Sequence, residues 1–166
     1  PTGDPLADVT SSEHNALARE IVAKATVLLK NENAVLPIVL SSDAASIKKI
    51  AVIGDEAIVS GTGSGKVEAA YVVTPTQGIT AAVAAAGFAD TVSVVYSDGK
   101  DVDEVTSLAA SSDVVIVLVA TTSGEGNDRP TLSLGEDQDD LVRAAVAANP
   151  RTVVAVTTPG ACLMPW

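Results

Sequence analysis

Two glycine-rich stretches contain the residues whose types and spacing could do chemistry. They are residues 61–66, Gly-Thr-Gly-Ser-Gly-Lys, and residues 121–129, Thr-Thr-Ser-Gly-Glu-Gly-Asn-Asp-Arg. In the second stretch Glu125 stands between two glycines, which make the backbone permissive and remove side chains that would screen the carboxylate. Glu125 could therefore project into a cleft and meet a ligand closely, and it is the candidate catalytic residue. The alternative is an ordinary glutamate on a surface loop.

Two charged residues, Asp128 and Arg129, follow Glu125 at once. The guanidinium group of Arg129 could orient a carboxylate or donate hydrogen bonds to ligand hydroxyls. The alternative is an Asp–Arg pair that fixes the loop. We include both residues among the candidate binding residues of a pocket next to Glu125.

The first stretch invites comparison with phosphate-binding loops, because glycine-rich turns expose backbone N–H groups. A P-loop needs a glycine where this chain has Ser60, and a Ser or Thr where it has Val67. The dinucleotide-binding pattern also fails, because the stretch does not lead directly into a helix. We expect Gly63, Ser64 and Lys66 to be pocket residues, the alternative being a loop whose glycines only allow positive φ or close approach.

No metal or cofactor is expected. Four acidic residues lie in the first turn of one predicted helix, where carboxylates complement the positive end of the helix dipole: Glu136, Asp137, Asp139 and Asp140. His14 is the only histidine, and Cys162 is the only cysteine. The sequence therefore offers neither an internal disulfide nor the usual nitrogen and sulfur ligands of a zinc site.

Hydrophobic periodicity predicts alternating strands and helices, which is typical of a parallel sheet with helices on both faces. The first helix, residues 13–29, should begin with a capping box at residues 10–13. The helix that ends at Gly87 should begin at Pro75, with Thr74 as its N-cap. Two further helices are expected, one from about residue 101 and one at 136–148. The predicted strands are residues 50–53, 91–96, 114–120 and 152–156.

The expected fold is an α/β, three-layer α/β/α sandwich with a flavodoxin-like, mostly parallel sheet of strand order 2-1-3-4. In this order the winding direction reverses between strands 1 and 3, and ligands bind at such a point, beyond the carboxyl ends of the strands. The two glycine-rich stretches leave strands 1 and 3. Topology and composition therefore indicate the same place.

Length and composition limit the number of domains and the classes of partner. The chain has 166 residues, 47% of them hydrophobic, which is enough for one core, so a single domain over residues 1–166 is expected. Its longest dense apolar run, residues 114–120, is far shorter than the about 20 residues of a membrane span. The formal charge of −11 argues against nucleic acid and anionic membranes as partners. We expect a soluble protein.

Several motifs in a fixed order resemble those of one family. They are residues 25–31 with Leu36 and Pro37, residues 50–54, residues 61–65 with 72–75 and Gly78, residues 123–129 with 132–134, and residues 159–160 with 163–166. In these segments the chain resembles glycoside hydrolase family 3, the β-glucosidases and their relatives, and specifically their C-terminal α/β sandwich domain. The resemblance covers essentially the whole chain.

This resemblance implies a retaining glycosidase whose two carboxyl groups come from different domains. Glu125 would be the general acid/base, and an aspartate nucleophile would lie on an N-terminal barrel domain, the expected partner. The substrate would be a β-glucoside or a short oligosaccharide, with Asp128, Arg129, Gly63, Ser64 and Lys66 forming part of its pocket. Glu125 would need a raised pKa, achieved when the barrel and the sugar close over it. The chain alone should be inactive.

The chain also departs from the family's pattern. No barrel is present, and the family's sandwich continues beyond the position of Trp166, so the domain is expected to be incomplete and truncated after its fourth strand. That strand would then be an apolar edge. No aromatic residue lies in either glycine-rich stretch, so sugar stacking would have to come from the barrel. The alternative function is a stand-alone flavodoxin-like binding or interaction module without catalysis.

Overall fold

The structure is a computed structural model that describes residues 3–4, 7–43, 46–56, 63–67, 69 and 71–166. The chain divides into two compact units, Pro1–Ala34 and Val35–Trp166, which we describe separately. No helix in these described ranges has the length and hydropathy that crossing a bilayer requires.

The first unit consists mainly of helix α1, Ser12–Ala25. Its N-cap is Ser11, whose Oγ accepts the backbone N–H of His14 at 3.2 Å. The predicted capping box at residues 10–13 is therefore wrong. The N-cap lies one residue later, and the N–H of Thr10, which the box would give to Glu13, donates to Asp8 Oδ1. The helix also ends earlier than the predicted residue 29. Thr26 is extended there, and its Oγ1 donates to the carbonyl of Val22 at 2.8 Å.

The second unit contains the sheet. Its strands are β1, Lys49–Gly54, β2, Ser93–Ser97, β3, Val114–Ala120, and β4, Thr152–Thr157. All neighbouring strands pair in parallel, in the order β2-β1-β3-β4, which confirms the predicted topology. Within the described residues β2 and β4 are the sheet's edges, and β4 is only partly buried.

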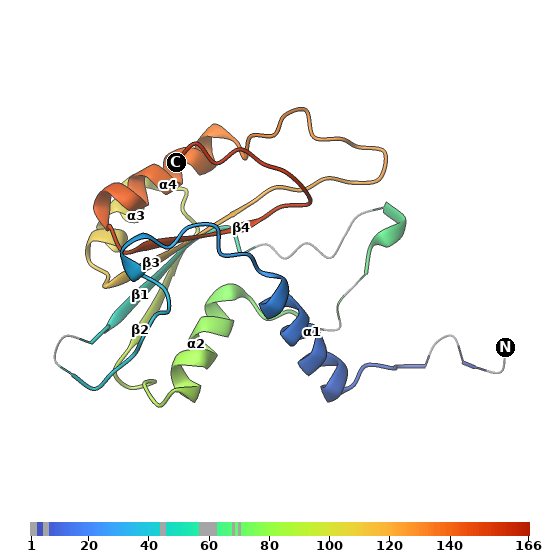
Figure 1. The fold of residues 1–166 in the computed structure, drawn as a ribbon, viewed down its shortest axis with the longest axis horizontal. Coiled ribbons are helices and arrows are strands. Elements are labelled where there is room, and N and C mark those ends of the chain that lie inside the picture. The colour runs from blue at the N-terminus through green and yellow to red at the C-terminus, as the bar shows by residue number, and fades with distance from the viewer. Residues whose placement is uncertain (1–2, 5–6, 44–45, 57–62, 68, 70) are drawn as a thin grey trace. The chain divides into compact units, whose positions relative to one another are not determined.

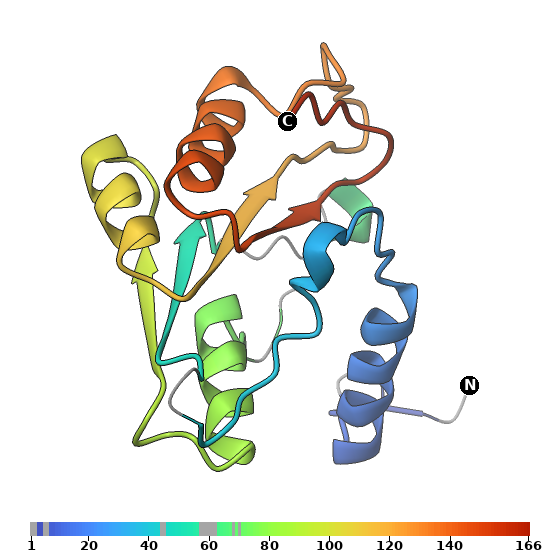
Figure 2. The ribbon, with the colours of Figure 1, turned by 60° about the vertical axis from the view of Figure 1, so that its left-hand side comes forward.

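Helices cover both faces of this sheet, as Figures 1 and 2 show. They are α2, Pro75–Ala85, α3, Val102–Ala110, and α4, Glu136–Ala148. Helices α3 and α4 pack over a core that includes Ala51, Ile53 and Val117. Helix α2 packs over the opposite face, against a core that includes Ile50 and Val114. Alternate residues of one strand thus enter different cores, so the predicted three-layer α/β/α sandwich is confirmed.

Local signals fix the start of helix α2. Thr74 caps it, Pro75 occupies its first turn, and Gln77 closes the capping box by accepting the N–H of Thr74 at 2.9 Å. Glu56, just after β1, accepts the N–H of Thr76 in the same turn. The end of β1 is therefore tied to the start of α2.

Gly54 brings the carboxyl end of β1 close to β3. Its φ is +119°, and a Cβ placed on it would lie 2.2 Å from the carbonyl oxygen of Leu118 on β3. Its own carbonyl accepts the hydroxyl of Tyr96 at 3.0 Å, which joins β2 to the same point. Only glycine permits both the backbone angle and the close approach.

We predict that Gly54→Ala lowers the free energy of unfolding by about 3 kcal/mol, because it combines an unfavourable φ with a backbone clash. Gly78→Ala is the control. It adds a methyl group inside helix α2 with nothing within 4 Å, so it should raise stability by about 0.5–1 kcal/mol. Urea unfolding of the chain measures both. Equal effects of the two substitutions would contradict the role given to Gly54.

Candidate active site

Glu125 lies at the tip of a tight turn beyond the carboxyl end of β3. The turn is closed by Gly124 and Asn127, which pair in antiparallel fashion and exchange backbone hydrogen bonds of 3.3 and 3.0 Å. Gly126 has a φ of +72°, which a glycine adopts without cost and which lets the chain reverse within two residues. The side chain of Glu125 is exposed. The flanking glycines thus present the carboxylate as the sequence predicts.

The carboxylate is met by the segment that follows β1. Oε2 of Glu125 accepts two hydrogen bonds from Ser64, one from the backbone N–H at 3.0 Å and one from Oγ at 2.8 Å. Ser64 lies in a short 3₁₀ turn, Gly63–Gly65. The two glycine-rich stretches therefore meet where the winding of the sheet reverses. Gly61 and Thr62 lie outside the described residues.

Gly63 allows this contact sterically. It has a φ of +64°, and a Cβ on it would lie 2.7 Å from both Cβ and Oε2 of Glu125. Real Cβ atoms do not approach other heavy atoms so closely, and any larger residue would push Glu125 away. Close approach of one backbone to another side chain thus explains a glycine at this position.

The Ser64 contacts lower the pKa of Glu125 below its ordinary value. The backbone hydrogen bond is the main cause, the hydroxyl adds to it, and partial desolvation opposes both. The carboxyl group is therefore ionised at neutral pH. A general acid needs the opposite shift, so a role as proton donor would require a change in the surroundings of Glu125.

Two adjoining hollows lie on this face. The smaller, about 220 Å³, contains Glu125 and is lined by Gly63, Thr122, Ser123, Gly124, Glu125 and Asn127. The larger, about 380 Å³, is lined mainly by the return limb of the same loop, residues 127–131 and 133–135. Thr122 and Asn127 line both hollows. Neither residue was among the candidates from sequence, although both are polar and lie within three residues of Glu125.

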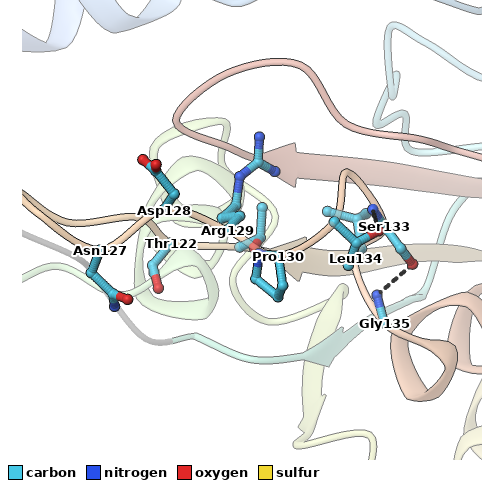
Figure 3. A pocket seen from close by; sticks show the side chains of 10 residues that line it. Thr122, Asn127, Asp128, Arg129, Pro130, Ser133, Leu134 and Gly135 are labelled. Carbon is cyan, nitrogen blue, oxygen red and sulfur yellow. Dashed lines mark hydrogen bonds between the residues drawn. The ribbon is translucent and has the colours of Figure 1, made fainter.

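Asp128 and Arg129 line the larger hollow, where Figure 3 shows their side chains diverging. Nη2 of Arg129 donates to the carbonyl of Ala161 at 2.6 Å. Its Nη1 is buried and has no hydrogen-bond partner in the described part of the chain. Among the ion pairs between described residues, none joins Asp128 to Arg129. The loop is therefore fixed by an arginine–carbonyl contact instead of the Asp–Arg pair considered from the sequence.

Lys66 is exposed and lines neither hollow. Its backbone N–H donates to the carbonyl of Gly63 at 3.2 Å and closes the short turn that holds Ser64. The structure thus brings Gly63 and Ser64 against Glu125, places Asp128 and Arg129 in the adjoining hollow, and leaves the Lys66 side chain outside both.

Two of the four acidic residues in the first turns of helix α4 have structural partners. Asp139 is buried and accepts Nε1 of Trp166 at 2.8 Å, while Asp140 pairs with Arg143 at 2.7 Å. Over the described residues, no group of three His, Cys, Asp or Glu side chains could hold a metal ion.

Comparison with known proteins identifies the domain. The family model of the glycosyl hydrolase family 3 C-terminal domain matches residues 26–166. The chain is 32% identical to a probable β-glucosidase L of Aspergillus terreus, over 95% of this chain and 24% of that protein. It is 34% identical to β-D-xylosidase 3 of Arabidopsis thaliana, over 92% of this chain and 20% of that protein.

Solved structures of similar proteins support the same family assignment. A glycoside hydrolase family 3 β-glucosidase from Neurospora crassa superposes with a TM-score of 0.78 at 30% identity, covering 92% of this chain and 20% of that one. The chain thus spans about a quarter, or less, of the length of these relatives. The motifs, the strand order and these matches agree, and the chain belongs to the glycosyl hydrolase family 3 C-terminal domain family.

Proposed function

We propose that this chain supplies the general acid/base, Glu125, of a retaining β-glucosidase-type glycoside hydrolase. The nucleophile of that enzyme would be an aspartate on an N-terminal barrel domain. One observation supports the proposal above others: Glu125 stands at the tip of the turn beyond β3, in contact with the segment that follows β1. In open parallel sheets this is where ligands bind.

Two carboxyl groups would share the reaction. In the first step the nucleophile attacks the anomeric carbon, and Glu125 gives its proton to the departing glycosidic oxygen. In the second step the Glu125 carboxylate takes a proton from the water that releases the sugar. Retention requires the two groups to lie about 5–5.5 Å apart, so the barrel must approach the Glu125 hollow closely.

The same approach would supply the change of pKa that the first step needs. Ser64 favours the ionised carboxyl, which suits the base of the second step. Covering Glu125 with a sugar and a barrel removes water, and a nearby ionised nucleophile adds like-charge repulsion. Both effects raise the pKa of Glu125 towards that of an acid.

The chain would form one wall of the sugar pocket. Gly63 lines the smaller hollow, and Asp128 and Arg129 line the larger one. Ser64 binds Glu125, and the backbone of Lys66 closes the turn that holds Ser64. No aromatic residue lines the Glu125 hollow among the described residues, so rings that stack on the sugar would come from the barrel. The proposed substrate is a β-glucoside or a short oligosaccharide. Relatives named β-glucosidase and β-D-xylosidase share this domain, which is consistent with sugar selection on the barrel side.

Glu125→Ala in the complete enzyme should lower kcat/KM for aryl β-glucosides with poor leaving groups by about 100-fold or more, because those substrates need protonation. Substrates with activated leaving groups should lose less in the first step, and added azide should partly restore their turnover. Glu104→Gln, an exposed position on helix α3, is the control and should behave as wild type. Equal loss on all substrates without azide rescue would exclude Glu125 as acid/base.

The 166-residue chain alone should not hydrolyse an aryl β-glucoside above the rate in buffer, because the nucleophile would be missing. The complete enzyme, assayed at the same molar concentration, is the positive control. Glu125→Ala in the isolated chain tests whether any residual rate comes from contamination. Turnover by the isolated chain that Glu125→Ala abolishes would contradict the divided active site.

A further inference from the structure

We propose that Ser64 is a positioning residue for Glu125, which holds Oε2 with two donors and leaves Oε1 as the oxygen that exchanges the proton. This inference rests on the acid/base role proposed above for Glu125. It assigns to Ser64 an action through another side chain, in place of direct contact with the sugar.

Both Ser64 donors converge on one oxygen. The backbone N–H lies 3.0 Å and Oγ 2.8 Å from Oε2 of Glu125. Oε1 has no hydrogen bond to any described residue. One oxygen of the carboxylate is therefore held by Ser64, and Glu125 itself lines the smaller hollow.

The backbone N–H of Ser64 determines which oxygen of Glu125 carries the proton. An N–H group can only donate, so a proton on Oε2 would compete with the hydrogen bond from Ser64. The protonated carboxyl group therefore has its hydrogen on Oε1. In the first step this proton passes to the glycosidic oxygen, which takes the electron pair of the broken bond to the anomeric carbon. In the second step Oε1 takes a proton from water as the water oxygen bonds to that carbon.

Gly63 makes the contact between Ser64 and Glu125 sterically possible. Its missing Cβ leaves room for Glu125, since a Cβ there would lie 2.7 Å from Oε2. The same contact sets the direction of the pKa shift of Glu125. The Ser64 hydrogen bonds lower the pKa, and partial desolvation opposes them.

The contact can be tested without activity. Carbon-detected NMR of the 166-residue chain follows the titration of the Glu125 carboxyl group. Ser64→Ala removes one donor to the carboxylate, so the Glu125 midpoint should move to higher pH, and Gly63→Ala should move it in the same direction. Ser64→Thr keeps the hydroxyl and should restore most of the original midpoint. The control Ser107→Ala removes an exposed hydroxyl from helix α3 and should change nothing. An unchanged midpoint in Ser64→Ala would overturn the proposal.

Kinetics of the complete enzyme then separates positioning from sugar binding. Ser64→Ala should lower kcat/KM on a poor leaving group about fivefold, mainly through kcat, the size expected for one hydrogen bond. The basic limb of the kcat/KM profile should move to higher pH, because that limb reports the ionisation of the acid.

A double-mutant cycle separates positioning of Glu125 from direct binding of the sugar by Ser64. In a Glu125→Gln background, Ser64→Ala should cause no further loss, because its effect acts only through the ionisable carboxyl group. A loss of the same size in both backgrounds, expressed in KM, would show that Ser64 binds the sugar directly and would overturn the inference alone. A fully active Glu125→Gln enzyme would instead overturn the proposed function, while the NMR titration would still test the Ser64–Glu125 contact.

Discussion

The pairing of β1 with β3 is the constraint on which the site depends. The two strands run parallel in a register that sets Ile53 opposite Val117 and Gly54 opposite Leu118, so both end at the same edge. β1 and β3 are separated in sequence by α2, β2 and α3, and because they are adjacent in the sheet, the loops that follow them lie side by side. Gly54 makes the approach possible, because its missing Cβ leaves room for the Leu118 carbonyl. Without this pairing Ser64 and Glu125, which are 61 residues apart, would not meet.

The loop that presents Glu125 is held from its other side by the C-terminal segment. Arg129 donates to the carbonyl of Ala161, and Leu163 donates its N–H to the carbonyl of Leu132 at 2.9 Å. The indole of Trp166 then binds Asp139 on helix α4. The tip of the turn is thus exposed while its return limb is anchored. An acid/base group needs this combination, because it must reach the reacting atoms from a defined position.

Much of the fold could be predicted from local patterns. Apolar runs such as residues 114–120 alternate with helical periodicity, and Thr74 and Pro75 mark a helix start by capping chemistry that needs no tertiary contact. The start of α1 could not be placed as well. Three adjacent hydroxyl residues, Thr10, Ser11 and Ser12, could each serve as the cap, and local sequence does not choose between them.

The site was predictable only in part, for the same reason. The glycines around Glu125 signal an exposed carboxylate, and their place after a strand is readable from the chain. The contact with Ser64 and that of Arg129 with Ala161 depend on loops that come together only in the folded sheet. Local sequence therefore indicates which side chain could do chemistry, whereas its partner and its lowered pKa follow from tertiary structure.

The most direct test of the central claim is the structure of the complete enzyme with its glycosyl intermediate trapped. We predict a barrel aspartate bonded to the sugar, with its carboxyl group about 5–5.5 Å from that of Glu125 and with Oε1 of Glu125 facing the anomeric carbon. A different acidic side chain beside the anomeric carbon, with Glu125 far from the sugar, would contradict this prediction.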